Sequence, residues 1–320
     1  MASSSKKVII AALIGNSLIA VTKFGAAAWT GSSAMLSEGI HSLVDTGNQV
    51  LLLYGLKRAQ KPADEQFPFG HGKEIYFWSF VVAILIFAVG AGVSAYEGVQ
   101  HLIHPREVED PVVNYVVLGA AMIFEGFAWY FAFREFTRAK GKWGYVEAVQ
   151  KGKDPSMFVV LFEDSAAMLG LVVAFLGILL GQITGIPYFD GIASIIIGLI
   201  LGATAVWLAY ETKGLLIGES ARNAVVEGIR ALVGNHPQVQ HVNEVLTMHM
   251  GPDFVLVNIS VDFRDQARAE EIEEAVAKMD RAIKEAYPRV KRVFIEGEAR
   301  RYYLREAASQ AAAHNAKNEN

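Results

Sequence analysis

The sequence predicts an α-helical membrane protein with six transmembrane helices, followed by a small α+β domain of the ferredoxin-like αββαβ type. Three observations predict this fold class. The first two-thirds of the 320 residues contain stretches long and apolar enough to cross a bilayer. Basic residues alternate between successive connections, and the last third returns to the mixed patterning of a soluble domain. The chain is 52% hydrophobic, so the distribution of apolar residues matters more than their total.

Six stretches could each span a membrane, which requires about 20 predominantly apolar residues. They are predicted at residues 8–29, 33–56, 75–103, 112–133, 158–184 and 188–217. The Ser-rich start, with Lys6 and Lys7 before an apolar run, has some features of a signal peptide. Because a second span follows almost at once, we interpret this start as an uncleaved first helix.

Lysine and arginine are concentrated before the first span and in the connections after the second and fourth spans. These residues are Lys6, Lys7, Lys57, Arg58, Lys61, Lys73, Arg134, Arg138, Lys140, Lys142, Lys151 and Lys153. The intervening connections contain only Arg106. Because positively charged loops remain in the cytoplasm, both termini are predicted to be cytoplasmic. No obvious amphipathic, Arg-rich transit peptide is visible, so a bacterial inner membrane is the expected location.

The chain beyond residue 217 is predicted to fold as a soluble domain. In its second helix, Ile272, Val276, Met279 and Ile283 fall on one stripe. The two longer strands are expected on either side of a Gly-Pro-Asp turn. The expected elements are helix 222–235, strands 242–250 and 254–263, helix 267–286 and strand 290–296. We therefore divide the chain into a transmembrane domain (1–217), a cytoplasmic domain (218–300) and a frayed or disordered tail (301–320).

Composition argues against several classes of function. The net charge of −4 gives no signal for nucleic-acid binding. The chain has no cysteine, which removes disulfides and thiolate ligands and argues against soft ions such as Cu⁺.

Several ionisable side chains fall inside the predicted spans, where each costs roughly 2.5–3.5 kcal/mol or more at mid-depth. They are Glu38, His41 and Asp45 in the second span, Glu125 in the fourth, and Glu163 and Asp164 in the fifth, with Asn16 as a polar group in the first. His41 and Asp45 are four residues apart and share a helix face. An imidazole and carboxylates from separate helices can bind a divalent ion such as Zn²⁺, Fe²⁺ or Mn²⁺, and a tetrahedral set of four favours zinc.

The same groups bind protons between about pH 4 and 7, so metal and H⁺ compete for one site. This predicts a proton-coupled metal exporter. An intramembrane metalloenzyme is a second hypothesis, but no nucleophile motif or HExxH signature is found. A transport-inactive scaffold or regulator is a third.

The polar groups also have structural interpretations. His41 and Asp45 could be a hydrogen-bonded pair, Glu38 could lie at the membrane interface, and Asn16 could join helices. His71, His101 and His104 are expected in loops or at the membrane interface. In the soluble domain, His249, Glu296 and Glu298 could bind metal, although exposed polar residues are the simpler interpretation.

Three motifs resemble those of the cation diffusion facilitator (CDF) family. They are GSSAMLSEGIHSLVD at 31–45, PAD at 62–64 and FGHGK at 69–73. Residues 154–170, DPSMFVVLFEDSAAMLG, resemble the branch that includes the mitochondrial-type zinc transporter. The resemblance covers nearly the whole chain. It implies a homodimeric, proton-coupled exporter of Zn²⁺ or a related ion, with helices 1, 2, 4 and 5 around the site, helices 3 and 6 outside, and a metallochaperone-like cytoplasmic domain.

The resemblance also implies a ligand set. His41 and Asp45 match the family's pair on helix 2, and Asp164 matches the aspartate on helix 5. The residue four before that aspartate is usually His or Asp, but here it is Val160. We expect Glu125 to complete the set.

Glu163 is the second candidate for the missing ligand. Without the usual His or Asp, Fe²⁺ or Mn²⁺ could replace Zn²⁺ as the transported ion. At the last strand of the soluble domain, Glu296 and Glu298 stand near the position where family members commonly have a His/Asp pair. The soluble domain is therefore expected mainly to dimerise.

Overall fold

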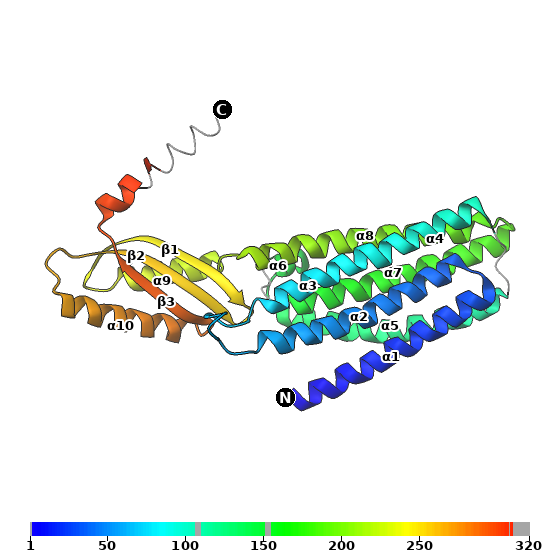
Figure 1. The fold of residues 1–320 in the computed structure, drawn as a ribbon, viewed down its shortest axis with the longest axis horizontal. Helices are drawn as coiled ribbons and strands as arrows, with labels where there is room; N and C mark the ends of the chain where they lie inside the picture. Colours follow the sequence, from blue (N-terminus) through cyan, green and yellow to red (C-terminus); the bar gives the residue numbers. More distant parts are fainter. Residues whose placement is uncertain (1, 106–109, 151–154, 307, 310–320) are drawn as a thin grey trace. The chain divides into compact units, whose positions relative to one another are not determined.

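The computed structural model describes residues 2–105, 110–150, 155–306 and 308–309. It divides the chain into two compact units, Met1–Leu216 and Ile217–Asn320. The first unit is a bundle of helices, and the second combines helices with a three-stranded sheet (Figure 1).

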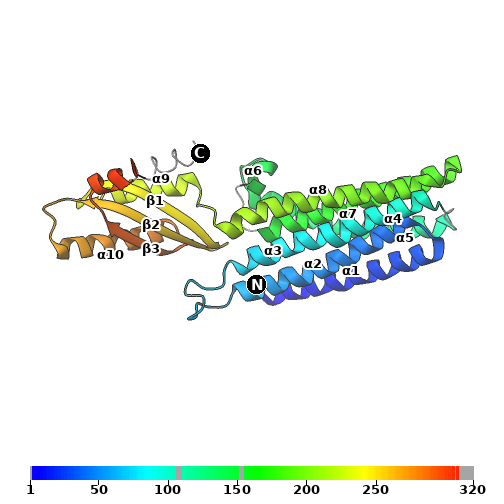
Figure 2. The ribbon, with the colours of Figure 1, turned by 45° about the horizontal axis from the view of Figure 1, so that its top comes forward.

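The first unit contains long helices that run side by side (Figure 2). They are α1 (Ala2–Thr30), α2 (Ser33–Ala59), α3 (Glu74–Leu85), the π-helical turn η1 (Ile86–Ala91), α4 (Gly92–Ile103), α5 (Pro111–Lys140), the short α6 (Tyr145–Gln150), α7 (Pro155–Thr184) and α8 (Tyr188–Ile217). Within the described residues, four helices are long and apolar enough to cross a membrane: Glu74–Ile103, Pro111–Arg138, Phe158–Thr184 and Tyr188–Ile217. The first of these is α3, η1 and α4 in one continuous helix.

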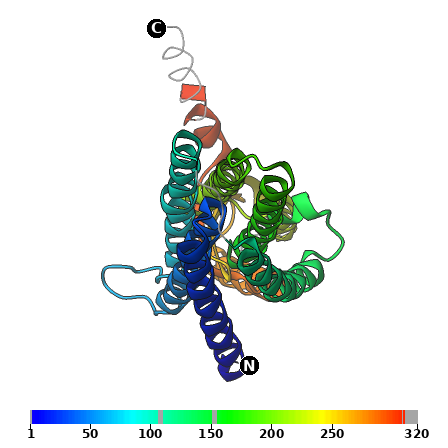
Figure 3. The same cartoon turned by 90° about the vertical axis from the view of Figure 1, so that its right-hand side faces the viewer.

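The other two predicted spans correspond to α1 and α2, which form helices of similar length. Helix α2 is less apolar than the four spans because it contains polar residues such as Glu38, His41 and Asp45. It contacts α1, α3, α4 and α7 and so lies at the centre of the bundle. Figure 3, which looks along the helices, shows α1 running at the edge of this arrangement.

The connection predicted between the fourth and fifth spans contains more helix than expected. Helix α5 continues to Lys140, where Arg138 and Lys140 stand in its last turn and complement the helix dipole. The ring of Tyr145 on α6 then stacks on Phe133 of α5 at a centroid distance of 5.5 Å. Lys140 lies over the same tyrosine ring, 4.6 Å from its centroid. These contacts hold α6 against the end of α5.

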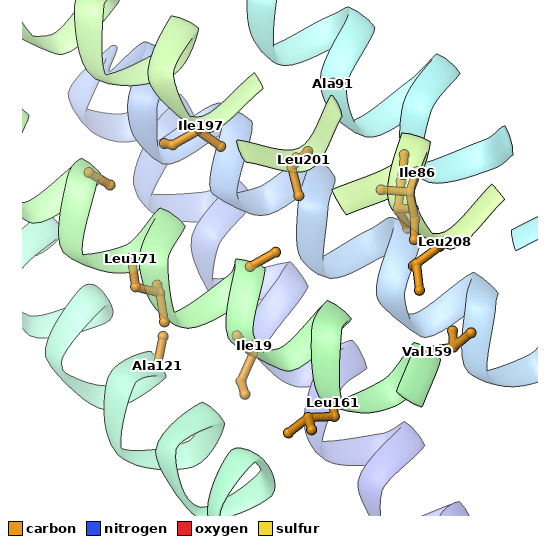
Figure 4. Packing of buried hydrophobic residues seen from close by; sticks show 14 of the residues in the cluster. Ile19, Ile86, Ala91, Ala121, Val159, Leu161, Leu171, Ile197, Leu201 and Leu208 are labelled. Atoms are coloured by element: carbon orange, nitrogen blue, oxygen red, sulfur yellow. The ribbon is translucent and has the colours of Figure 1, made fainter. Parts of the chain in front are cut away.

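Apolar side chains from α1, α5, α7 and α8 fill the space between the helices. Figure 4 shows Leu171 of α7 facing Ala121 of α5, and both are buried. Ile197, Leu201 and Leu208 of α8 extend the same core. This packing fixes how the polar faces of α2, α5 and α7 meet.

A buried polar network fixes the turn between α1 and α2, which we call the α1–α2 end of the bundle. Gly31 adopts φ +69°, which ends α1, and the Ser32 hydroxyl accepts a hydrogen bond from the backbone N–H of Met35. Asp190, in the first turn of α8, accepts hydrogen bonds from the Ser32 hydroxyl (2.5 Å) and the Ser33 backbone N–H (2.6 Å).

His101, near the end of α4, joins the same network. Its Nδ1 atom lies 3.0 Å from Asp190 Oδ2 and 2.8 Å from the Ser33 hydroxyl. His101 is only 6% exposed and lies in the last turn of α4, so the expected loop position was wrong. The imidazole instead helps to hold α2, α4 and α8 together.

Asp190→Ala should lower the free energy of unfolding by about 3–5 kcal/mol, because it removes the acceptor that the Ser33 backbone and His101 share. Thermal melting of the detergent-solubilised protein measures this change. Asp110→Asn is the control, since Asp110 is exposed, its side chain accepts only a 3.2 Å hydrogen bond from Trp29 in the described structure, and asparagine tolerates its left-handed backbone (φ 44°). Equal melting temperatures for the two variants would contradict a structural role for the network.

The second unit has the predicted αββαβ order. It contains α9 (Asn223–Gly234), β1 (Val239–Gly251), β2 (Phe254–Phe263), α10 (Ala269–Ala286) and β3 (Val290–Gly297). Strands β1 and β2 are antiparallel, whereas β2 and β3 are parallel and are connected through α10. Met279 and Ile283, on the predicted stripe of α10, are buried against Ile229 and Val233 of α9 and against the sheet. The unit is therefore a small mixed α/β domain with its own core.

Candidate cation-binding site

The polar face of α2 places His41 and Asp45 inside the bundle. His41 is 1% exposed, and its Nδ1 atom lies 3.4 Å from Asp45 Oδ1. Among the residues that the structure describes, neither ring nitrogen of His41 forms a hydrogen bond, nor does Asp45 Oδ1. Buried polar atoms are rarely left in this condition unless an ion or water satisfies them. The pair thus has free donor atoms at the point where a cation could be bound.

Carboxylates from α5 and α7 approach the same place. Glu125 of α5 and Glu163 of α7 are buried, and Asp164 beside it is half-buried. All three lie close enough to Asp45 for electrostatic repulsion, and Asp45 and Glu163 are within hydrogen-bonding reach of each other. We refer to His41, Asp45, Glu125, Glu163 and Asp164 as the cation-binding cluster. Three separate helices, α2, α5 and α7, contribute to it.

Glu163 has a second partner within the cluster. The Asn48 side-chain amide, two helical turns beyond His41 on α2, donates a 2.8 Å hydrogen bond to Glu163 Oε1. This contact joins α2 to α7 on the side of His41 away from the α1–α2 end. It also orients the glutamate toward Asp45.

The side chains of the cluster lie near one another but do not surround a common point. In the described part of the chain, no three His, Asp or Glu side chains are arranged so as to enclose a metal ion. Val160, at the position where the family commonly has His or Asp, packs half-buried against the apolar core. Asn16 is half-buried on α1. A cation would have to draw the donors of α2, α5 and α7 together.

An ion pair lies beside the cluster, and one partner was missed in the sequence. The Lys23 ammonium of α1 lies 3.0 Å from Glu38 Oε2 and donates a 2.8 Å hydrogen bond to the Ser42 hydroxyl. Both charged side chains are fully buried. Glu38 therefore faces Lys23 inside the bundle. A lysine in the middle of the first predicted span was the signal, since such residues are rare in membranes.

Gly170 of α7 packs against the carboxylate of Glu38. A Cβ atom at this position would collide with Glu38 Oε1. Only glycine therefore allows the carboxylate of α2 to approach the backbone of α7 so closely.

The candidate residues of the second unit are not brought together. His249 on β1 pairs with Val255, whereas Glu296 on β3 pairs with Ser260, five residues further along β2. Glu296 is exposed. Glu298 accepts a 2.9 Å hydrogen bond from the Ser260 hydroxyl. His249 thus lies toward the opposite end of the sheet from the two glutamates.

The connection between α2 and α3 is also organised by a histidine. His71 contacts Asp64 through Nε2 (2.9 Å) and Glu74 through Nδ1 (3.2 Å). Glu74 in turn pairs with Arg58 of α2 at 2.8 Å. The hydrogen bond from His71, followed by that from the Phe67 backbone N–H, holds the pKa of Asp64 below its ordinary value.

His71→Ala should therefore raise the pKa of Asp64 toward its ordinary value of about 4. Because the pKa is depressed in the folded loop, the contribution of Asp64 to loop stability is present above the ordinary value and is lost as the pH falls through the depressed value. An NMR titration of the Asp64 carboxyl carbon measures the midpoint. An unchanged midpoint in His71→Ala would show that the imidazole does not set this pKa.

Fold and site together define an integral membrane protein with a buried cluster of ionisable side chains in its helical unit. Residues 9–217 match the family described as the cation efflux transmembrane domain. The chain belongs to this cation efflux (CDF) family, which is a family of transporters and not of enzymes.

Individual relatives differ in the ion that their names give. The proton-coupled zinc antiporter SLC30A9, mitochondrial, of Homo sapiens is 35% identical over 260 residues, which are 80% of this chain and 46% of that protein. Metal tolerance protein C4 of Arabidopsis thaliana is 30% identical over 265 residues, 82% of this chain and 58% of that protein. The chain thus spans about half the length of these relatives. The manganese efflux system protein MneP of Bacillus subtilis is 26% identical over 266 residues, 81% of this chain and 84% of that protein.

Proposed function

We propose that this protein exports a divalent metal cation, zinc in the first place, from the cytosol in exchange for protons. The observation that carries the proposal is the convergence of His41, Asp45, Glu125 and Asp164 from three helices in the interior of the membrane unit. One imidazole and several carboxylates suit a borderline divalent cation. The name of the human relative, a proton-coupled zinc antiporter, supports this choice.

Proton coupling follows from the crowding of the carboxylates. Asp45 and Glu163 are within hydrogen-bonding reach, and such a contact requires a proton on one of them. A divalent cation that binds to the cluster takes the place of that proton. Protons that enter from the opposite side would in turn release the cation. Metal and proton therefore occupy the cluster alternately.

The proposal includes a topology of six spans. Helices α1 and α2 would cross the membrane with the four apolar spans, since they have the required length and α2 places its polar residues inside the bundle. The basic connections put both termini in the cytoplasm, and a bacterial inner membrane is the proposed location. The second unit would join two copies into a homodimer.

Mn²⁺ or Fe²⁺ is the alternative substrate, and one observation favours it. Val160 removes a donor, so the cluster offers one imidazole among carboxylate oxygens. Oxygen-rich sets suit harder ions than zinc. The name of the Bacillus subtilis relative, a manganese efflux system protein, points the same way.

Reconstituted proteoliposomes test the proposed function. With a pH gradient imposed and a metal-sensitive dye inside, we expect Zn²⁺ uptake that collapses when an ionophore removes the gradient. Parallel assays with Mn²⁺ and Fe²⁺ rank the substrates. Binding without flux of any of the three ions would favour a transport-inactive scaffold and overturn the proposal.

A further inference from the structure

The position of the Lys23–Glu38 pair along the bundle can be given relative to His41. Glu38 lies one helical turn from His41, toward the α1–α2 end, and Lys23 reaches it from α1. On the other side of His41 lie Asp45 and Asn48. Glu38 therefore lies between a cation held at His41 and Asp45 and the α1–α2 end, while the Lys23 ammonium reaches from Glu38 to Ser42 alongside His41.

The pair seals this level through three helices. Lys23 of α1 binds Glu38 and Ser42 of α2, and Glu38 fits against Gly170 of α7. Neither charged side chain is exposed. A fixed ammonium group in this low-dielectric setting also repels a divalent cation that approaches from the cluster.

Other buried contacts close the bundle at the same end. The hydroxyls of Ser37 and Ser194 join α2 to α8 at 2.7 Å. The Thr30 hydroxyl donates to Asn114 Oδ1 of α5 at 2.9 Å. These contacts tie α1, α2, α5 and α8 together between the cluster and the α1–α2 end.

We propose that Lys23 is a positioning residue of transport, whose pairing with Glu38 closes the path between the cation-binding cluster and the α1–α2 end, and that export requires this pair to separate. The inference rests on the proposed function. Lys23 blocks the path while its side chain is held between Glu38 and Ser42, and moves aside with α1 when the path opens. Glu38 keeps the ammonium in place and is not itself a ligand of the bound cation.

The pair can be removed without leaving a buried charge. Lys23→Met or Glu38→Gln alone strands one charge and should lower stability, whereas the double variant retains similar side-chain shapes without any charge. If the pair is purely structural, the double variant should fold and remain closed at the α1–α2 end. If the pair closes the path, the double variant should fold but be open at that end. Lys23→Arg retains the charge and should keep the path closed.

Cysteine labelling distinguishes these cases, because the chain has no cysteine of its own. Ala20→Cys places a reporter about one turn from Lys23, away from the α1–α2 end, where Ala20 is 4% exposed. Ala27→Cys is the matched control, because Ala27 lies on the other side of Lys23 and lines a pocket of about 620 Å³. A charged, membrane-impermeant thiosulfonate reagent is added on the side from which Ala27→Cys is labelled.

We expect the Lys23→Met/Glu38→Gln background to increase the labelling rate of Ala20→Cys at least tenfold, with the rate of Ala27→Cys unchanged. Lys23→Arg should label Ala20→Cys as slowly as the unmodified pair. Zn²⁺ affinity of the double variant, measured by titration calorimetry, should remain within about threefold.

An unchanged labelling rate at Ala20→Cys in a folded double variant would overturn the proposal. Loss of the folded protein in that variant would do so as well, because it would make the pair a requirement for folding. If the unmodified protein transports no metal, the proposed function fails, yet the labelling rates still report whether the pair closes this end.

Discussion

Asp45→Ala and Asp164→Ala should each reduce metal transport by at least about 100-fold while the protein remains folded. Asp45 is buried beside His41 on α2, and Asp164 reaches the same cluster from α7. Loss of a residue that only supports a metal ligand costs about 10–100-fold in affinity, so loss of a ligand itself should cost more. Initial rates of Zn²⁺ uptake into proteoliposomes, normalised to folded protein, measure the effect.

Asp110→Asn provides the control for both variants, because it removes an exposed carboxylate at the end of the bundle. Its transport rate should equal that of the unmodified protein. Near-normal uptake by either Asp45→Ala or Asp164→Ala would remove that residue from the ligand set.

Glu125→Gln should slow transport by at least about tenfold and change its pH dependence. Glu125 is 5% exposed on α5, lies within electrostatic range of Asp45 and Asp164, and has no helix-capping position that would explain its burial. The amide retains the shape of the side chain but neither carries a charge nor exchanges a proton at these pH values. Uptake rates between pH 6 and 8 measure both effects, and a slower rate with an unchanged pH profile would exclude Glu125 from proton exchange.

Glu135→Gln is the control on the same helix. Glu135 is 69% exposed and pairs loosely with Arg138 at 3.7 Å, so its substitution should have no effect. If Glu125→Gln transports as fast as Glu135→Gln with the same pH profile, Glu125 takes no part in the mechanism. Val160 would then remain the unexplained gap in the ligand set.

The elements of the fold could be predicted because their signals are local. Apolar length marks the four spans, and periodic spacing marks α10, whose buried residues include Met279 and Ile283. That Asp45, Glu125 and Asp164 would face the interior of the bundle was also predictable, because an ionisable residue inside a membrane segment is rarely exposed to lipid.

The partners of the buried residues were not predictable in the same way. Lys23 and Glu38 are 15 residues apart on different helices, and only the packing of α1 on α2 makes them neighbours. Asp190 accepts a hydrogen bond from the Ser33 backbone at the start of α2, although the two residues are 157 positions apart in the sequence. Sequence spacing specifies which face a side chain occupies, but it does not specify which helix lies opposite that face.

The most direct test of the central claim is titration calorimetry of Zn²⁺ into the purified protein, in buffers with different ionisation enthalpies. If the cation displaces protons from the cluster, the apparent binding enthalpy of the unmodified protein will vary with the buffer. In Asp45→Ala/Asp164→Ala, both the binding and the buffer-dependent proton release from the membrane unit will be lost. Binding with the same affinity and the same proton release in that double variant would contradict the assignment of the cluster as the transport site.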